Sequence, residues 1–551
     1  MLKTIFIFLI TSIFINMPLP SNKIKAFING KIYTVNEKQP LAESVIIEND
    51  KIIFVGSNEE AKKFLDGSAE ITNLNGKLML PGFIDAHVHL MEAGFYLLGI
   101  NLHNVKSKTE FRQVLAEYVS RKRGKWITGG RWDHEQWNEK KLPDKSLIDD
   151  ITPDIPVFLE RVDGHMGLAN SYALKLAGID KNTPDPQGGL IIKDPKTGEP
   201  TGIIKDNAMP LIYRVIPPPY FNDYYEAALE ALQTAKRFGV TGVHDISYKE
   251  HLEVYNQLEK EGKLTCRIYS ILPIADYEFV IDSLRPGRKD SMIKMGGLKA
   301  YADGSLGSST AWFFQPYEQD STNTGLPNDI ILNGKLEQWA LDADKNGLQV
   351  CTHAIGDKAN ATVLDIYEKV RKENLLRDRR FRIEHAQHVR PGDITRFAEN
   401  KVIASCQPYH AIDDGAWAEK RIGKERLKYS YAYKSFLDAG VKLSFGSDWP
   451  VAPVNPIMGI YAAVTRRTLD GKNPDGWIPG QKITVEEAIK CYTINNAYAS
   501  FEENIKGSIE PGKLADFVVL DGDILTIDPV KIKDAKVVMT ILGGEIIYQA
   551  K

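Results

Sequence analysis

Short apolar runs of strand length alternate with longer amphipathic stretches through most of this chain. Eight such runs follow one another, at residues 82–88, 242–246, 267–272, 298–302, 348–352, 382–384, 402–405 and 441–445. Strands that alternate with helices form right-handed βαβ units and a parallel sheet, and eight such strands fit a closed barrel. The pattern predicts an α/β fold, a TIM-like (β/α)8 barrel.

The gap between the first and second runs is far longer than the two to six residues usual for a βα connection. We therefore predict an inserted subdomain at 91–235. It has strand-like pieces at 126–130 and 157–161 and a helix-like piece at 170–177.

At both ends of the chain the sequence pattern is that of short strands separated by turns. The N-terminal ones are at 26–35, 44–55 and 71–80, and the C-terminal ones at 516–520, 537–542 and 545–548. We predict that segments 22–80 and 505–551 form one small composite β-sandwich domain. Residues 81–504 then form the barrel with its insertion.

The first residues have the order of a signal peptide, because Lys3 is followed by a mostly apolar stretch at 5–17 and then by Pro18 and Pro20. The apolar part is shorter than the roughly 20 residues that a spanning helix needs. We expect residues 1–21 to be removed, the mature chain to start near Asn22, and the protein to be periplasmic or secreted. The alternative is a membrane anchor by an uncleaved leader, since no clean A-x-A site follows; no other membrane contact is expected.

The composition of the chain limits the classes of molecule that can be its partner. The 551 residues carry a formal net charge of -3 with 43% hydrophobic content, so the basic excess that binds nucleic-acid phosphates is missing. The four cysteines are far apart, which favours reduced, structural thiols. We expect a small-molecule partner and no nucleic acid, and leave a homodimer open.

The sharpest local feature is the end of the first run, where His87 and His89 are two positions apart. Alternate side chains of a strand share a face, so both imidazoles can point into a barrel and hold one ion. The alternative is two partly buried, hydrogen-bonded histidines.

Four further residues stand at or just beyond the ends of later runs: Lys299, His353, His385 and Asp448. Catalytic groups of such barrels lie at the carboxyl ends of the strands. Imidazoles and carboxylates suit zinc and similar divalent ions. We therefore predict that these residues converge with the first two histidines.

The ordered set resembles the amidohydrolase superfamily, and its branch similar to N-substituted formamide deformylases. Segments 303–308, 353–357 and 507–516 resemble that branch, as do 130–133 and Asn170-Ser171 in the insertion. The resemblance implies a divalent metal, zinc in our prediction, as one or two ions. It also implies ligation by His87, His89, Lys299, His353, His385 and Asp448, with Lys299 carboxylated by CO2 and bridging two metals. The alternative for Lys299 is an ion-paired or surface lysine.

The resemblance implies hydrolysis of a non-peptide C–N bond, in an amide, formamide or cyclic amide, and the ligand set predicts that metal-activated hydroxide is the attacking group. Asp448 is the candidate general base, and His410 is placed to stabilise the oxyanion or touch substrate. Asp133, His165 and Trp449 are candidate substrate-binding residues. An esterase or lactonase on the same site, or a non-catalytic regulatory barrel, are the alternatives.

Overall fold

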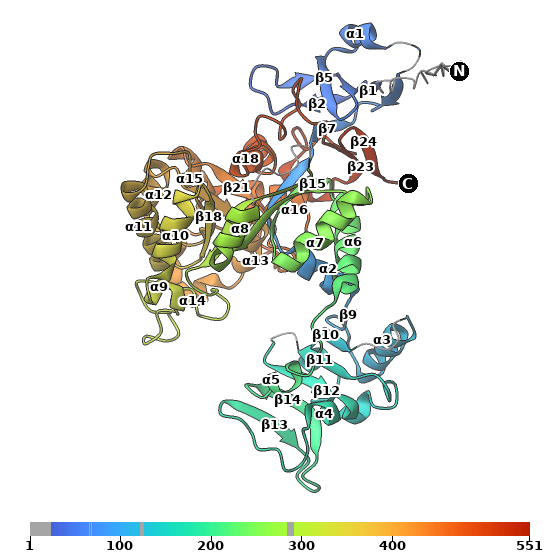
Figure 1. The fold of residues 1–551 in the computed structure, drawn as a ribbon, viewed down its shortest axis with the longest axis vertical. Helices are drawn as coiled ribbons and strands as arrows, with labels where there is room; N and C mark the ends of the chain where they lie inside the picture. Colours follow the sequence, from blue (N-terminus) through green and yellow to red (C-terminus); the bar gives the residue numbers. More distant parts are fainter. Residues whose placement is uncertain (1–23, 66, 68, 122–125, 162–163, 284–290) are drawn as a thin grey trace, which may run out of the picture.

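The computed structural model describes residues 24–551 except 66, 68, 122–125, 162–163 and 284–290, so the predicted leader lies outside the described residues. Its centre is an eight-stranded parallel sheet in the order β21-β20-β19-β18-β17-β16-β15-β8 (Figure 1). The strands are β8 (Phe83–Val88), β15 (Val240–Ile246), β16 (Arg267–Pro273), β17 (Ile293–Tyr301), β18 (Gln349–Ala354), β19 (Arg382–His385), β20 (Ile403–Cys406) and β21 (Leu443–Phe445). Each predicted run overlaps one of these strands, and the predicted barrel is confirmed.

The seam between the first and last strands is closed just beyond their carboxyl ends. The backbone N–H of Asp448 donates to the His87 carbonyl at 2.7 Å, and the N–H of His89 donates to the Trp449 carbonyl at 2.8 Å. Two candidate ligands, His87 in β8 and His89 just after it, are therefore hydrogen-bonded to the segment that follows β21.

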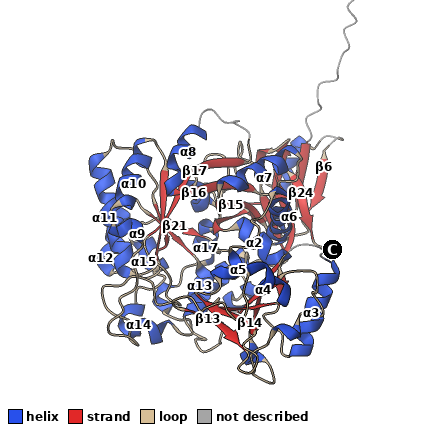
Figure 2. Cartoon of the chain, turned by 60° about the horizontal axis from the view of Figure 1, so that its bottom comes forward, coloured by secondary structure: helices blue, strands red, loops and turns tan. Residues whose placement is uncertain are grey.

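Helices surround the strands (Figure 2). They are α7 (Lys249–Lys260), α8 (Tyr277–Ser283), α9 (Asp329–Leu332), α10 (Lys335–Lys345), α11 (Asp357–Glu373), α12 (Pro391–Glu399), α13 (Pro408–Asp414), α14 (Ala418–Leu427), α15 (Tyr433–Asp438), α16 (Pro456–Thr465), α17 (Val485–Cys491) and α18 (Ile494–Ala499). In α11 the residues Val363, Tyr367 and Val370 recur every three or four positions and are buried, as expected for a helix that packs one face on the core. None of the helices among the described residues is long and apolar enough to cross a membrane.

Between β8 and β15 the chain forms a separate six-stranded sheet, which lies below the barrel in Figure 1. Its order is β13-β14-β12-β11-β10-β9, from β9 (Ile100–Asn101), β10 (Ile127–Trp132), β11 (Val157–Arg161), β12 (Met166–Ala169), β13 (Gly189–Lys193) and β14 (Pro200–Asp206), with helices α3 (Lys108–Arg121), α4 (Ser171–Ala177) and α5 (Pro210–Tyr213). The flanking helices α2 (Leu90–Leu98) and α6 (Phe221–Arg237) lie at the two ends of the predicted 91–235 and largely within it, yet they share an apolar cluster with Val88 and Val240 of the barrel.

The strands of the N-terminal segment divide between two sheets. One has the order β5-β4-β1-β6, and the other, β24-β23-β22-β7-β2-β3, combines both ends of the chain. The strands are β1 (Ile24–Ile28), β2 (Lys31–Tyr33), β3 (Leu41–Ala42), β4 (Ser44–Glu48), β5 (Lys51–Gly56), β6 (Glu70–Asn73), β7 (Leu78–Pro81), β22 (Phe517–Leu520), β23 (Val537–Leu542) and β24 (Glu545–Gln549); α1 (Asn58–Ala61) follows β5. Phe27 of β1 packs edge-on against Phe517 of β22, with 6.1 Å between ring centroids, so the two sheets share an apolar layer.

Candidate metal centre

Most of the predicted ligands meet at the mouth formed by the carboxyl ends of the barrel strands. Asp448 lies at the middle of this group. Its Oδ1 is 3.4 Å from Nε2 of His87 and 3.3 Å from Nε2 of His89, and its Oδ2 is 4.0 Å from Nε2 of His410. The donor atoms of His87, His89 and Asp448 lie within 4.8 Å of one another, and so do those of His385, His410 and Asp448. One carboxylate is thus shared by two pairs of imidazoles.

The charge states of these groups suit a cation. Burial, with Lys299 nearby, lowers the pKa of His87 to about 4. Burial also holds the pKa of His385 well below its usual value, helped by His353. Burial raises the pKa of Asp448, but a hydrogen bond from His89 and the nearby imidazoles outweigh it and hold this pKa well below its usual value. Neutral imidazoles keep a lone pair and the carboxylate keeps its charge at neutral pH.

One atom tests the fit of this donor set to a metal. Nδ1 of the buried His385 has no hydrogen-bond partner among the described residues. A buried polar atom without a partner costs free energy, so it points to a group that binds there. Three or four nitrogen and carboxylate donors are what a divalent metal such as zinc requires. The residues fit such an ion.

The backbone at these positions is strained. His385, Ala386 and Asp448 have φ values of 71°, 42° and 61°, in the left-handed region that residues other than glycine rarely adopt. Each such residue costs on the order of 1–3 kcal/mol and persists only where its surroundings enforce it. At Asp448 the hydrogen bond to the His87 carbonyl holds the turn, which directs the carboxylate toward the histidines.

His353 of β18 lies beside this cluster and is outside both trios of donor atoms. Its ring is 4.4 Å from that of His385 in an edge-on arrangement. Its Nε2 is 3.0 Å from the Gly304 carbonyl, which only accepts, so Nε2 carries the hydrogen and Nδ1 keeps the lone pair. Asp303 stabilises the backbone around His353, because its carboxylate accepts hydrogen bonds from the backbone N–H groups of Trp312, Ile355 and Gly356.

Lys299 lies within β17, two residues before its end, and is 3% exposed. Its Nζ is 3.2 Å from Nε2 of His87 and 4.9 Å from the centre of the Tyr301 ring. Burial lowers the pKa of this amine. The surface-lysine alternative therefore does not describe its environment, and the buried amine faces the histidine cluster.

None of the three predicted substrate-binding side chains makes a polar contact with the cluster among the described residues, and Trp449 meets it only through its backbone carbonyl, which accepts from His89. Asp133 pairs with Arg161 at 2.9 Å, and Nδ1 of His165 lies 3.0 Å from Asp206; all four belong to the inserted subdomain. Trp449 is 4% exposed and lies in the apolar cluster of α2 and α6. Their role in substrate binding stays a prediction.

Sequence reasoning missed the polar residues that support the ligands, Glu384, Arg382 and Asp303. The first two are fully buried, and Oε2 of Glu384 lies 2.6 Å from Nδ1 of His87. A signal was present, because two charged residues alternate in a strand that is buried throughout. Charges in such a strand need partners.

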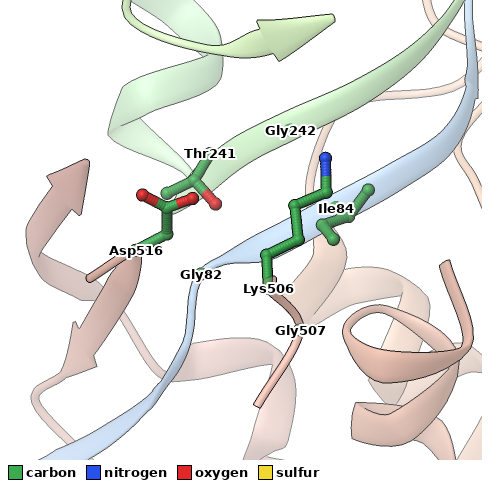
Figure 3. A pocket seen from close by; sticks show the side chains of 7 residues that line it. All are labelled: Gly82, Ile84, Thr241, Gly242, Lys506, Gly507 and Asp516. Carbon is green, nitrogen blue, oxygen red and sulfur yellow. The ribbon is translucent and has the colours of Figure 1, made fainter. Parts of the chain in front are cut away.

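A small pocket lies near the opposite, amino-terminal end of the barrel strands. It is lined by Gly82, Ile84, Thr241, Gly242, Lys506, Gly507 and Asp516, and Figure 3 shows the side chains of Lys506 and Asp516 on its two sides. Both charges are already paired, Lys506 with Glu502 at 2.7 Å and Asp516 with Arg267 at 2.7 Å. This pocket is separate from the metal centre.

Known proteins agree with the fold. The model of the "Amidohydrolase family" matches residues 70–548. Protein LONG AFTER FAR-RED 3 of Arabidopsis thaliana is 41% identical, covering 94% of this chain and 91% of the relative, and an N-substituted formamide deformylase of Arthrobacter pascens is 29% identical over 95% and 98%. The crystal structure of an uncharacterized metal-dependent hydrolase from Pyrococcus horikoshii is 30% identical, with a TM-score of 0.78, over 92% of this chain and 99% of that one. The chain belongs to the amidohydrolase family.

Proposed function

We propose that this protein is a metal-dependent hydrolase that cleaves a non-peptide C–N bond of a small molecule, in an amide, formamide or cyclic amide. The observation that carries the proposal is the convergence of four imidazoles on the Asp448 carboxylate at the mouth of the barrel. The name of the deformylase relative, which specifies a C–N substrate, supports the choice of bond.

The metal would be held by His87, His89, His353, His385 and Asp448 together with Lys299, and we propose zinc, as one ion or two. A bound divalent cation supplies Lewis acidity and lowers the pKa of water. The buried Lys299 amine has a lowered pKa, which favours the neutral form that reacts with CO2. The N–C bond formed releases one proton and leaves a carbamate, whose two oxygens suit a bridging ligand. Crystals of metal-loaded protein that lacked carbamate density at Lys299 would contradict this part.

Asp448 is the proposed general base. Its Oδ2 lies 4.0 Å from Nε2 of His410, and this oxygen would take a proton from the attacking water and deliver it to the leaving nitrogen. His410, through Nε2, is positioned to donate a hydrogen bond to the oxygen on which negative charge develops. Nε2 of His410 has no hydrogen-bond partner among the described residues, which supports a role for it toward substrate.

The experiment combines metal analysis with a turnover screen. Purified protein is analysed for bound metals and then assayed on N-formyl and N-acyl compounds, hydantoins, esters and lactones, with and without chelator. We expect stoichiometric divalent metal and chelator-sensitive cleavage of a C–N bond. Cleavage of lactones or esters alone would favour the esterase alternative, and bound metal without any turnover would favour a regulatory barrel.

We further propose that the chain is exported to the periplasm or secreted, with a small molecule as its partner. N-terminal sequencing of material from that compartment should begin near Asn22; retention of Met1 would indicate an anchored leader instead.

A further inference from the structure

A layer of buried charge lies inside the barrel, beneath the histidine cluster. Arg382 and Glu384 are two residues apart in β19, so both side chains point to the same side of the strand. Both are 0% exposed. Buried charges are costly unless they are paired and hydrogen-bonded, so each contact here contributes to the arrangement of the residues it joins.

Glu384 connects a candidate ligand to this layer. Its Oε2 is 2.6 Å from Nδ1 of His87, and its Oε1 forms an ion pair with Nε of Arg382 at 2.7 Å. A carboxylate only accepts hydrogen bonds, so Nδ1 of His87 carries the hydrogen and donates it. The lone pair of His87 is then on Nε2, the nitrogen that faces Asp448 and Lys299.

Arg382 fixes the same ligand from a second direction. Its Nη2 donates to the carbonyl of Ala86 at 2.6 Å and to Oγ of Ser405 at 3.0 Å. Nη1 lies 2.9 Å from Nδ1 of His244, a residue that is also fully buried. Because Ala86 directly precedes His87, the guanidinium holds the backbone of the ligand while Glu384 holds its ring.

We infer that Glu384 is a positioning residue that, supported by Arg382, keeps His87 in the tautomer with its lone pair on Nε2 and thereby sets how tightly the site binds a divalent cation. The inference rests on the proposed function in that it takes the cluster to be a metal site. A carboxylate that accepts the second N–H of a ligating imidazole fixes its tautomer and orientation, and loss of such a partner typically weakens metal binding by about 10–100-fold.

The test compares two double variants that differ only in the acceptor. Arg382→Met/Glu384→Gln and Arg382→Met/Glu384→Leu both remove the buried ion pair with little change in volume, but only the first keeps an oxygen that can accept from His87. Zinc affinity is measured on metal-free protein by competition with a chromophoric chelator. Melting temperatures of the metal-free forms report the fold. We expect the Leu form to bind zinc about 10–100-fold more weakly than the Gln form, at similar melting temperatures.

A matched control uses the other arginine–glutamate pair near β19. Nη2 of Arg380 lies 2.8 Å from Oε1 of Glu503, and this ion pair is not part of the histidine cluster. Arg380→Met/Glu503→Gln removes a less buried arginine–glutamate pair that does not contact His87, so the zinc affinity of this variant should equal that of the wild type. A loss as large as that of the Leu form would show that any broken ion pair weakens binding, and would overturn the inference.

Equal zinc affinities in the Gln and Leu forms, with tight wild-type binding, would overturn the inference alone. A wild-type chain that bound no divalent cation would overturn the proposed function together with it. If either double variant fails to fold, the tautomer of His87 is measured in the wild-type protein instead. Zinc-loaded protein labelled with 15N-histidine is compared with His87→Asn, and the lost signals should be those of an imidazole protonated at Nδ1. Protonation at Nε2 would overturn the inference.

Discussion

The two ends of the barrel use charged residues in opposite ways. At the amino-terminal end, Arg267 donates to both oxygens of Asp516, at 2.7 and 3.0 Å, and Lys506 pairs with Glu502. At the carboxyl end, Nδ1 of His385 and Nε2 of His410 are buried without hydrogen-bond partners among the residues that the structure describes. Charges that satisfy one another stabilise the fold, whereas donors left open are available for a ligand.

We expect the largest effect from Asp448→Asn. An unaffected turnover in this variant would contradict the contrast drawn between the two ends of the barrel. The amide cannot take up a proton at neutral pH, so we expect turnover to fall about 10²–10⁴-fold. The melting temperature should change little. Steady-state assays on the substrate found in the screen provide the measurement, with Asp413→Asn as the control on an exposed carboxylate. A turnover near that of the wild type would remove Asp448 as the base.

At the other end of the barrel, Arg267→Met should lower stability and leave turnover of the folded protein unchanged. The substitution removes the arginine partner of the Asp516 carboxylate, whose side chain is 7% exposed. Breaking a buried ion pair from one side costs about 3 kcal/mol in the free energy of unfolding. Denaturant titration measures this. Lys369→Met removes an exposed pair with Glu337 and should cost less than about 1 kcal/mol. Lost turnover in folded Arg267→Met would contradict the division between the two ends.

The smallest expected effect is on the pH dependence of the free energy of unfolding, and it comes from Asp414 near the mouth of the barrel. Burial raises the pKa of Asp414 to about 6, although hydrogen bonds from Tyr431 and Gln387 act to lower it. The folded protein thus binds this proton more tightly than the unfolded chain. Its stabilising contribution is present below pH about 4 and is lost as the pH rises through about 6.

Asp414→Asn should therefore flatten the fall in unfolding free energy across this window, by at most about 3 kcal/mol. Urea titrations at several pH values measure the change, and Asp154→Asn, which removes an exposed carboxylate outside the surroundings of Asp414, should leave the slope as it is. An unchanged slope in Asp414→Asn would show that Asp414 does not titrate in this way.

The sequence predicted the barrel because each buried parallel strand is an apolar run of its own, and it predicted the cluster because ligands follow the ends of such runs. The start of β17 was missed, since Lys294, Gly296 and Gly297 interrupt its apolar pattern. The division of the N-terminal strands between two sheets depends on β7 pairing with β22, more than 400 residues away in the chain, which local pattern does not encode.

The supporting residues were harder to predict than the ligands. Glu384 and Arg382 stand in a four-residue strand next to His385, and only the packed barrel reveals that they face His87. In the same way, the hydrogen on Nε2 of His353 follows from the position of the Gly304 carbonyl, which lies 49 residues earlier.

The seam between β8 and β21 has a consequence for biosynthesis. His87 and His89 are translated early, but the hydrogen bonds that close the barrel beside them come from Asp448 and Trp449. All the candidate imidazoles are therefore translated before the residues that close the seam, which become available only when residues 448 and 449 have left the ribosome. A metal site built from these imidazoles would be complete only when the cylinder closes.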